Sequence, residues 1–392
     1  MALVQTLRGL YWKAQYPLDA FRGQIQTSSS LWPLLSQADL ADLRDFPYPP
    51  YPTWAANPSS PWHTHILNTL HPFLPLTFAA VYYLFAKSAD NFLIGKAGGY
   101  DYTKSSRALR TTIILHNTLL TIFSAWIFVN VAPAAITFLI AGWAGAGWQG
   151  FKLAACSIPT NYPHLARYVW FFYVSKYYEV IDSLILVLKG KKIGELQAFH
   201  HAGALICMWV AYRYQSQNVW VFTAWNSGVH TLMYMYYVFT AMRWPFPRAL
   251  KRSLTTLQML QIASGTIVTN LSLYFTLSPA TVVKHGLLPS SPVRRFDSLW
   301  SAAYPSPIIT AIQRLKQCPT GTGCACIESR GAALSLHINT CYMIPLIALF
   351  AQFFIQNYLG GGKSKARAKS EKKKKKKGPA TNGHANGHAK AD

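Results

Sequence analysis

The sequence predicts an all-α integral membrane protein with about seven transmembrane helices around an interior tunnel. Three observations lead to this prediction. The 392 residues are 51% hydrophobic and only 13% charged, whereas soluble domains carry roughly 25% charged residues. Seven apolar segments approach the roughly 20 residues that cross a bilayer as a helix. Polar side chains recur at helical spacing inside several of these segments, which indicates that they face the protein interior and not lipid.

The predicted spans divide the chain into five parts. The spans cover 66–86, 111–140, 168–188, 199–213, 219–241, 256–277 and 335–357. Residues 1–60 are interrupted by prolines and charges, so we expect a peripheral arm and no cleavable signal peptide. The other parts are a six-span membrane domain (61–277), a long irregular loop (278–334), the seventh span (335–358) and a disordered Lys-rich tail (359–392). A lineage-specific insertion or a gene-model artefact would each explain the unusual stretch 300–332.

The distribution of charge predicts the orientation. Part of the net charge of +24 is concentrated between Lys363 and Lys377. A block of like charges of this kind is typical of a disordered, solvated tail and not of a nucleic-acid-binding surface. Predicted loops at 87–110, 189–199 and 242–255 carry twelve Lys and Arg residues, against three in the short loops on the other side. Because short cytosolic loops are enriched in positive charge, we place these loops and the C-terminus in the cytosol.

Residues 175–237 hold most of the candidate chemistry. Two polar stripes each share one face of a predicted helix, the first being Lys176, Glu179 and Asp182 and the second Asn226, His230, Met233 and Tyr237. Between them, Gln197, His200 and His201 follow a short basic hairpin. An ionisable group at mid-membrane is unfavourable by about 2.5–3.5 kcal/mol on insertion scales, so such residues predict a functional site. Two stripes on separate spans predict one shared cavity.

Four strings in this region resemble motifs of a known family. SKYYEVIDS, QAFHH, NSGVHTLMYMYY and TTLQMLQ are similar to the motif series SKxxExxDT, HxxHH, NxxVHxxMYxYY and TxxQxxQ of the ELO family of fatty acid elongases. The resemblance covers roughly residues 60–277, and the string FFIQNYL in the last span is weakly similar to the family as well. Within the family, the chain resembles fungal members. Ser183 stands where the family has Thr, and Gln197 replaces the first His of the box, giving a QxxHH variant.

The resemblance implies a very-long-chain 3-oxoacyl-CoA synthase. Such an enzyme is an acyltransferase that condenses malonyl-CoA with a long-chain acyl-CoA in the endoplasmic reticulum membrane, the first step of the elongation cycle. It implies acyl-CoA, malonyl-CoA and membrane lipids as partners, together with the ketoacyl reductase, dehydratase and enoyl reductase of the cycle. No cofactor and no metal are expected beyond the co-substrate malonyl-CoA.

His200 is the expected nucleophile. Holding the acyl group on the enzyme divides a difficult transfer into two easier steps, and a neutral imidazole can attack a thioester directly. The resemblance implies an acyl-imidazole on the second His of the box, which is His200. His201, about 100° further around the helix, is expected to orient or polarise the site. His230 is expected to stabilise the enolate or thioester oxygen, with Asn226 as its helical neighbour.

The roles of the surrounding residues have alternatives. Gln197 would suffice if it only orients His200 at i+3, but an amide cannot transfer protons as imidazole does, so reduced activity is also possible. Lys176, Glu179 and Asp182 either lock a helix or contact CoA and the histidines. Met233 is expected to support the site. Tyr234, Tyr236 and Tyr237 belong either to the site or to a hydrogen-bonded core, and Asn117 and Ser124 either contact substrate or form interhelical hydrogen bonds. Gln258, Gln261 and Thr255 are expected to pack between helices and line the tunnel. Arg243, Arg248, Lys251 and Arg252 either bind the phosphates of CoA or only set the topology.

Two other classes fit less well. A membrane di-iron desaturase needs about eight histidines in several boxes, but this chain has no second box. A seven-span receptor or transporter would explain a polar cavity but not adjacent histidines near a cytosolic mouth. The six cysteines show no spacing typical of a zinc site, and the close pair Cys324 and Cys326 indicates at most a loop that oxidises if it is lumenal.

Overall fold

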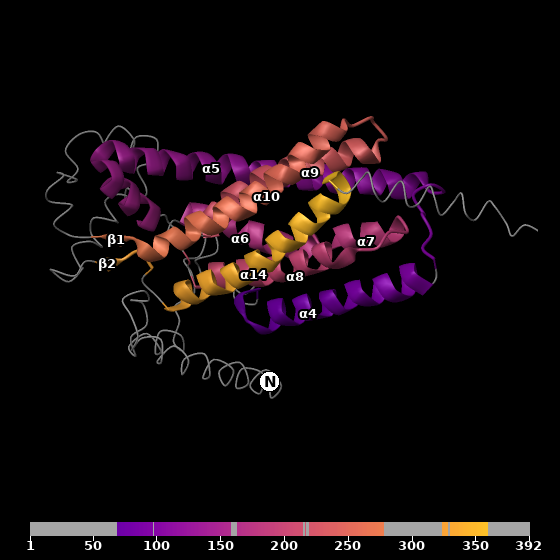
Figure 1. Ribbon diagram of the computed structural model, residues 1–392, viewed down its shortest axis with the longest axis horizontal. Coiled ribbons are helices and arrows are strands. Elements are labelled where there is room, and N and C mark those ends of the chain that lie inside the picture. Colours follow the sequence, from indigo (N-terminus) through magenta and orange to yellow (C-terminus); the bar gives the residue numbers. More distant parts are fainter. Residues whose placement is uncertain are drawn as a thin grey trace, which may run out of the picture.

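The computed structural model describes most of the region predicted to lie in the membrane. The described residues are 69–96, 98–157, 163–214, 216, 219–277, 324–327 and 330–359. The predicted N-terminal arm, most of the 278–334 loop and the tail beyond 359 lie outside them. Within the described part, α-helices dominate, and the only strands are two of two residues each (Figure 1). The prediction of an all-α protein is therefore confirmed for this part of the chain.

The elements follow one another in this order. They are α4 (Phe73–Ser88), a π-helix η2 (Ala89–Lys96), α5 (Arg107–Ser157), α6 (Pro163–Tyr178), α7 (Ile181–Leu188), α8 (Gly194–Arg213), α9 (Val219–Ala241), α10 (Arg248–Leu271), a 3₁₀ turn η3 (Ser272–Tyr274), β1 (Thr276–Leu277), β2 (Cys324–Ala325), α14 (Arg330–Phe354) and a π-helix η4 (Ile355–Leu359).

Every predicted span corresponds to helix, but several boundaries were wrong. The span predicted at 219–241 coincides with α9. The helix predicted at 256–277 already begins at Arg248, directly after Pro247, and ends at Leu271, while Thr276 and Leu277 form β1. The predicted seventh span begins at Arg330, inside the segment predicted as an irregular loop.

Two helices differ from the prediction in continuity. The predicted span 168–188 is interrupted between α6 and α7, where the amides of Asp182 and Ser183 donate to Glu179 and Val180, three residues back, instead of four. The span predicted at 111–140 is part of the 51-residue helix α5. It contains a single proline, Pro133, and continues to Ser157. Within it, Gly147 has a φ of 56°, a left-handed conformation that glycine adopts without a Cβ clash.

Five helices enclose the centre of the molecule. Helix α8 packs against α14, α14 against α10, α10 against α9, and α6 against both α8 and α9. Helix α4 packs on the outside of α8, while α5 packs along α9 and α6 (Figure 1). The polar stripes predicted on different spans therefore face a common interior.

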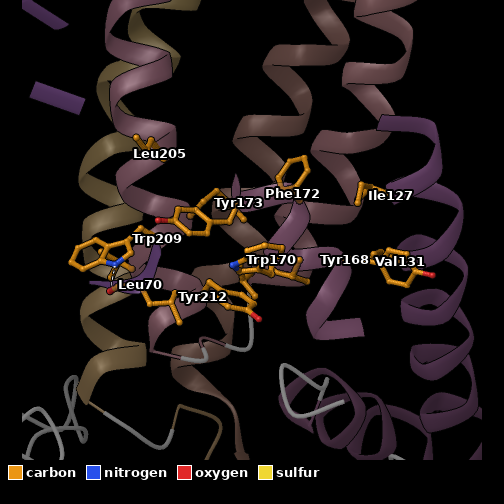
Figure 2. Close-up of a cluster of buried hydrophobic side chains, with 14 of the residues drawn as sticks. Leu70, Ile127, Val131, Tyr168, Trp170, Phe172, Tyr173, Leu205, Trp209 and Tyr212 are labelled. Atoms are coloured by element: carbon orange, nitrogen blue, oxygen red, sulfur yellow. Dashed lines mark hydrogen bonds between the residues drawn. The ribbon is translucent and has the colours of Figure 1, made fainter. Parts of the chain in front are cut away.

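An aromatic cluster joins α6 and α8 at one end of this enclosure. Tyr173, Trp170 and Trp209 are almost completely buried in it (Figure 2). The Trp209 indole donates a 2.9 Å hydrogen bond to the carbonyl of Leu70, and Tyr173 donates to the carbonyl of Thr69 at 2.6 Å. These bonds satisfy the polar ends of large side chains whose rings pack closely. The cluster fixes α6 and α8 relative to each other.

The outer surface of the helices is apolar. On α5, Leu115, Ile122 and Val129 are each at least 60% exposed, and Leu84 on α4 and Leu260 on α10 are similarly exposed. Monomeric soluble proteins rarely present such extended apolar faces. Two described segments, Arg107–Ile136 and Gly331–Leu359, are long and apolar enough to cross a membrane by length and composition.

A disulfide and a small strand pair tie α5 to the segment before α14. Cys156, in the last turn of α5, is bonded to Cys326, which directly follows β2. Strands β1 and β2 pair antiparallel through Thr276 with Ala325 and Leu277 with Cys324. The loop that contains Cys326 is thus oxidised, but the partner, Cys156, lies 170 residues away in sequence and was not predicted.

This disulfide should contribute measurably to stability. A crosslink that closes a long loop reduces the entropy of the unfolded chain, so Cys326→Ser should lower the free energy of unfolding by about 2–4 kcal/mol. Thermal unfolding of the purified protein in detergent measures the change. Cys341→Ser, at an exposed free thiol, is the matched control and should leave the midpoint unchanged. Alkylation of Cys156 in the unfolded, unreduced wild type would contradict the assignment.

Candidate active site

An interior cavity of about 720 Å³ lies between α6, α7, α8, α9, α10 and α14. One end is bordered by Lys192, Lys251 and Gln356, and the other by Ala211, Ser216 and Val219. His200, His201 and His230 all line it. The cavity thus combines a mouth that carries two lysines, a central group of histidines and a far end that is mostly apolar.

The histidine box on α8 is held by contacts at the start of that helix. Asp90, in η2, accepts hydrogen bonds from the amides of Ile193 at 2.6 Å and Gly194 at 2.8 Å. A carboxylate at this position accepts hydrogen bonds from amides that have no partner within the helix. Its negative charge also interacts favourably with the positive end of the helix dipole. The neighbouring Lys87 and Glu195 form an ion pair. Together these contacts set the direction in which Gln197, His200 and His201 enter the cavity.

The turn before α8 packs closely on the chain that follows η2. Gly190 has a φ of 65°, and a Cβ there would lie 3.0 Å from the backbone of Tyr100, so glycine is needed. Burial, reinforced by Lys191, lowers the pKa of Lys189, whereas Asp101 acts in the opposite direction. The backbones of Asp101 and Lys189 form a β-bridge. The turn therefore gives α8 a fixed starting point.

His200 is hydrogen-bonded on one side of its ring only. Its Nδ1 lies 2.8 Å from the hydroxyl of Tyr342 on α14. The same hydroxyl donates to the carbonyl of His200 at 3.1 Å. No hydrogen bond to Nε2 is found among the residues that the structure describes, and this nitrogen is not among their fully buried, unpartnered atoms. Nε2 is the ring nitrogen available to a molecule in the cavity.

Gln197 contacts a different histidine from the one expected. Its Nε2 lies 2.8 Å from Nε2 of His201, four residues further along α8. The condition considered above, in which Gln197 orients His200 at i+3, is not what the structure shows, because the amide meets the i+4 residue instead. His201 also lines the cavity beside His200, with ring centroids 5.4 Å apart. The two histidines are offset by about 100° around α8, but both rings still border the same cavity.

A buried polar network surrounds His230. The ammonium of Lys176 donates to Glu179 at 2.7 Å and lies 3.5 Å from the amide oxygen of Asn226. Nδ1 of His230 lies 3.9 Å from Glu179 Oε2. Both atoms are buried and have no hydrogen-bond partner among the described residues. Glu179 thus faces a cation on one side and an imidazole on the other.

The network continues onto α10. Asn226 donates to Gln261 at 3.4 Å, and Gln258 donates to the Met233 sulfur at 3.3 Å. Asn226, Met233, Gln258 and Gln261 all line the cavity. Three helices are therefore joined by polar contacts at the depth of the histidines.

Asp182 does not join Lys176 and Glu179 in one ion-pair stripe. It lies on α7, beyond the break at the end of α6, where its Oδ2 accepts from Tyr234 at 2.7 Å and its Oδ1 lies 2.9 Å from Nε2 of His116. His116 Nδ1 in turn lies 3.1 Å from the Tyr178 hydroxyl. The predicted ion pair therefore forms only between Lys176 and Glu179, although Asp182 lines the cavity together with Lys176.

Some of the remaining candidate residues line the cavity and others do not. Tyr234, Tyr236, Tyr237, Lys251 and Thr255 line the cavity, but no lining position is found for Arg243, Arg248 or Arg252. Ser183 is buried and its hydroxyl lies 2.7 Å from that of Tyr82. Asn117 donates within its own helix to Ile113 and so makes no interhelical bond through this group.

Two residues of the site were not predicted from the sequence. Tyr342 lies on α14, 142 residues from His200, and His116 lies on α5, 66 residues before Asp182. The signal available for both was a polar residue within an apolar span. Among the described residues, no group of three or more His, Cys, Asp or Glu side chains could hold a metal ion.

Comparison with known proteins identifies the family. Residues 68–367 match the ELO family, described as the GNS1/SUR4 family. The chain is 30% identical over 162 residues to "Putative fatty acid elongase 3" of Caenorhabditis elegans, covering 41% of this chain and 48% of that protein. It is 28% identical over 264 residues to "Very long chain fatty acid elongase 6" of Drosophila melanogaster, covering 66% of each.

A mammalian relative is more distant. The chain is 26% identical over 214 residues to "Very long chain fatty acid elongase 3" of Mus musculus, covering 53% of this chain and 73% of that one. The chain spans about half the length of the first curated relatives it matches. No solved structure matches it significantly. The family match extends over most of the 392 residues, and the chain belongs to the ELO (GNS1/SUR4) family of membrane proteins.

Proposed function

We propose that the protein is a fatty acid elongase, a very-long-chain 3-oxoacyl-CoA synthase. It condenses malonyl-CoA with a long-chain acyl-CoA to give 3-oxoacyl-CoA, carbon dioxide and CoA. The observation that carries this proposal is the unpartnered Nε2 of His200 beside a cavity that is basic at one end and apolar at the other. The printed names of the relatives, all fatty acid elongases, support the same reaction.

In the proposed mechanism, Nε2 of His200 attacks the acyl thioester. The C–S bond breaks, CoA thiolate leaves, and the acyl group remains on the imidazole. Malonyl-CoA then loses carbon dioxide, and the resulting carbanion attacks the acyl carbonyl and releases His200. The thiolate takes up one proton, so the complete reaction consumes one proton. His201 cannot replace His200 in this role, because its Nε2 is already hydrogen-bonded to Gln197.

His230 is proposed to stabilise the oxyanion of the enolate or thioester. The carboxylate of Glu179 lies 3.9 Å from its Nδ1 and is already paired with Lys176 at 2.7 Å. The role proposed for His230 is therefore that of a hydrogen-bond donor to the developing oxyanion. Preorganised donors of this kind act strongly in a site of low dielectric constant.

The ends of the cavity are assigned to the two parts of the substrate. Lys251 and Lys192 at the mouth suit the phosphates of CoA, while Ala204, Met208 and Ala211 line the path proposed for the acyl chain. Ala211 lies eleven residues beyond His200 on α8, which corresponds to about 16 Å along the helix. The cavity is thus proposed to be the tunnel that receives the chain.

We further propose a seven-span protein of the endoplasmic reticulum with a cytosolic C-terminus and mouth. The disulfide between Cys156 and Cys326 belongs to the end of the helices opposite the mouth. Disulfides persist in oxidising compartments and not in the cytosol, which supports a lumenal location for that end. The reductases and dehydratase of the cycle remain the proposed partners, and the QxxHH box is proposed to be active, with Gln197 orienting His201.

The first test removes the nucleophile. His200→Ala should lower the formation of 3-oxoacyl-CoA from labelled malonyl-CoA by at least about a thousandfold, because loss of a nucleophile removes the whole covalent route. Microsomes from an elongase-deficient yeast expressing the protein provide the assay. His337 lies on α14 and is not among the residues that line the cavity. His337→Ala is therefore the control and should remain active. Full turnover by His200→Ala would remove the proposed mechanism.

The second test concerns His116. His116→Leu removes the group beside Asp182 and should lower kcat about tenfold, because Asp182 then holds the Tyr234 hydroxyl less firmly. His116→Gln keeps an N–H at a similar distance and should recover most of the activity. Product formation at saturating acyl-CoA is the measurement. Equal loss in both variants would show that packing at this position, and not the hydrogen bond, matters.

The third test concerns the acyl chain. Ala211→Phe fills the far end of the cavity, so the longest fatty acids made by the wild type should disappear and shorter products accumulate. Fatty-acid profiling of the same yeast, fed saturated and unsaturated acids, measures the shift. Ala80→Phe, at an exposed position of α4, makes the same substitution outside the cavity and should leave the profile unchanged. An unaltered profile for Ala211→Phe would place the acyl chain elsewhere.

A further inference from the structure

We propose that Tyr342 is a positioning residue that fixes the tautomer of His200, with the proton on Nδ1 and the lone pair on Nε2. This inference deepens the proposed function and rests on it for its kinetic consequence. The tautomer itself is a property of the resting protein. It follows from two contacts of one hydroxyl group, which lies on a helix far from the histidine box in sequence.

The hydroxyl of Tyr342 has one proton and two neighbouring acceptor positions. It lies 3.1 Å from the carbonyl of His200 and 2.8 Å from Nδ1 of the same residue. If the hydroxyl donates to the carbonyl, its oxygen can accept a proton from Nδ1, and two hydrogen bonds form. If it donates to Nδ1 instead, only one forms. Buried polar groups strongly favour the arrangement with more bonds.

Close packing holds Tyr342 at this place. Its side chain is 7% exposed and its ring stacks on Phe199, with centroids 5.5 Å apart. A Cβ at Gly203 would lie 2.2 Å from the Tyr342 ring, so the ring occupies the space left by the missing side chain of Gly203. The hydroxyl cannot move away from His200 unless this packing changes.

The tautomer determines which nitrogen can react. A neutral imidazole attacks through the nitrogen that has no proton. With the proton on Nδ1, the lone pair on Nε2 faces the cavity, where no described side chain hydrogen bonds to it. When Nε2 forms the acyl bond, the ring becomes positively charged, and the Tyr342 oxygen stabilises the remaining Nδ1–H. The proton stays on Nδ1 throughout, so the attack requires no separate base.

The kinetic experiment isolates the acyl-transfer half of the reaction. Exchange of labelled CoA into acyl-CoA, measured without malonyl-CoA, reports attack by His200 and its reversal. Tyr342→Phe keeps the ring and removes the hydroxyl. It should lower the maximal exchange rate about tenfold to a hundredfold, with little change in the KM for acyl-CoA. Gly203→Ala, which displaces the same ring, should have a similar effect.

A matched control lies near the same end of the chain. Tyr358, in η4, has its hydroxyl 3.2 Å from that of Thr255 and makes no described contact with His200. Tyr358→Phe therefore removes a comparable hydroxyl without altering the imidazole, and it should exchange at the wild-type rate. Exchange by Tyr342→Phe at the wild-type rate would overturn the proposal. So would an equal loss in the two Tyr variants.

A second measurement does not depend on activity. Solid-state ¹⁵N NMR of histidine-labelled protein in bilayers distinguishes the two neutral tautomers, and His200→Gln assigns the signal of His200. The wild type should show protonated Nδ1, and Tyr342→Phe should show a mixture. A wild-type His200 protonated on Nε2 would overturn the inference even if the protein elongates. The expected tautomer in a protein without exchange or condensation activity would instead reject the proposed function.

Discussion

The structure depends on one constraint, which is that polar side chains inside an apolar helix bundle must find their partners within the protein. Lipid and apolar side chains offer them no partners, and an unpaired buried group is unfavourable by several kcal/mol. Lys176 meets this requirement through Glu179 and Asn226, and Asn226 through Gln261. Because these residues lie on α6, α9 and α10, their pairing also fixes how the helices surround the cavity.

The same constraint makes the exceptions informative. Lys176, Asn226 and Asp182 have partners within the protein, but among the described residues Nε2 of His200 has no hydrogen bond, and Nδ1 of His230 faces Oε2 of Glu179 at 3.9 Å without one. Groups left incomplete within an otherwise satisfied network are typical of sites that complete their contacts with a substrate. His201, by contrast, is already occupied by Gln197, which distinguishes two adjacent residues of identical type.

Sequence periodicity predicted the features that depend on a single helix. The position of α9 and the shared face of Asn226, His230, Met233 and Tyr237 follow from 3.6 residues per turn, and all four line the cavity. The break between α6 and α7 was not predicted, because no proline or glycine marks it. The pairing of His116 with Asp182, of Tyr342 with His200 and of Cys156 with Cys326 depends on which helices become neighbours. A single sequence does not contain that information in its local pattern.

The arrangement of the site along the cavity separates the two kinds of chemistry that the proposed reaction needs. The phosphates of CoA and the carboxylate of malonyl-CoA are strongly hydrated and must stay near the basic mouth, whereas a long acyl chain is stabilised by apolar surroundings. The reacting thioester joins these parts, so the nucleophile has to lie where the polar and apolar regions meet. His200 lies there, one turn beyond Gln197 and before Ala204, Cys207 and Met208. Its hydrogen-bond partner must then come from a helix that reaches the same depth without narrowing the passage. Tyr342 satisfies this condition because Gly203 leaves space for its ring.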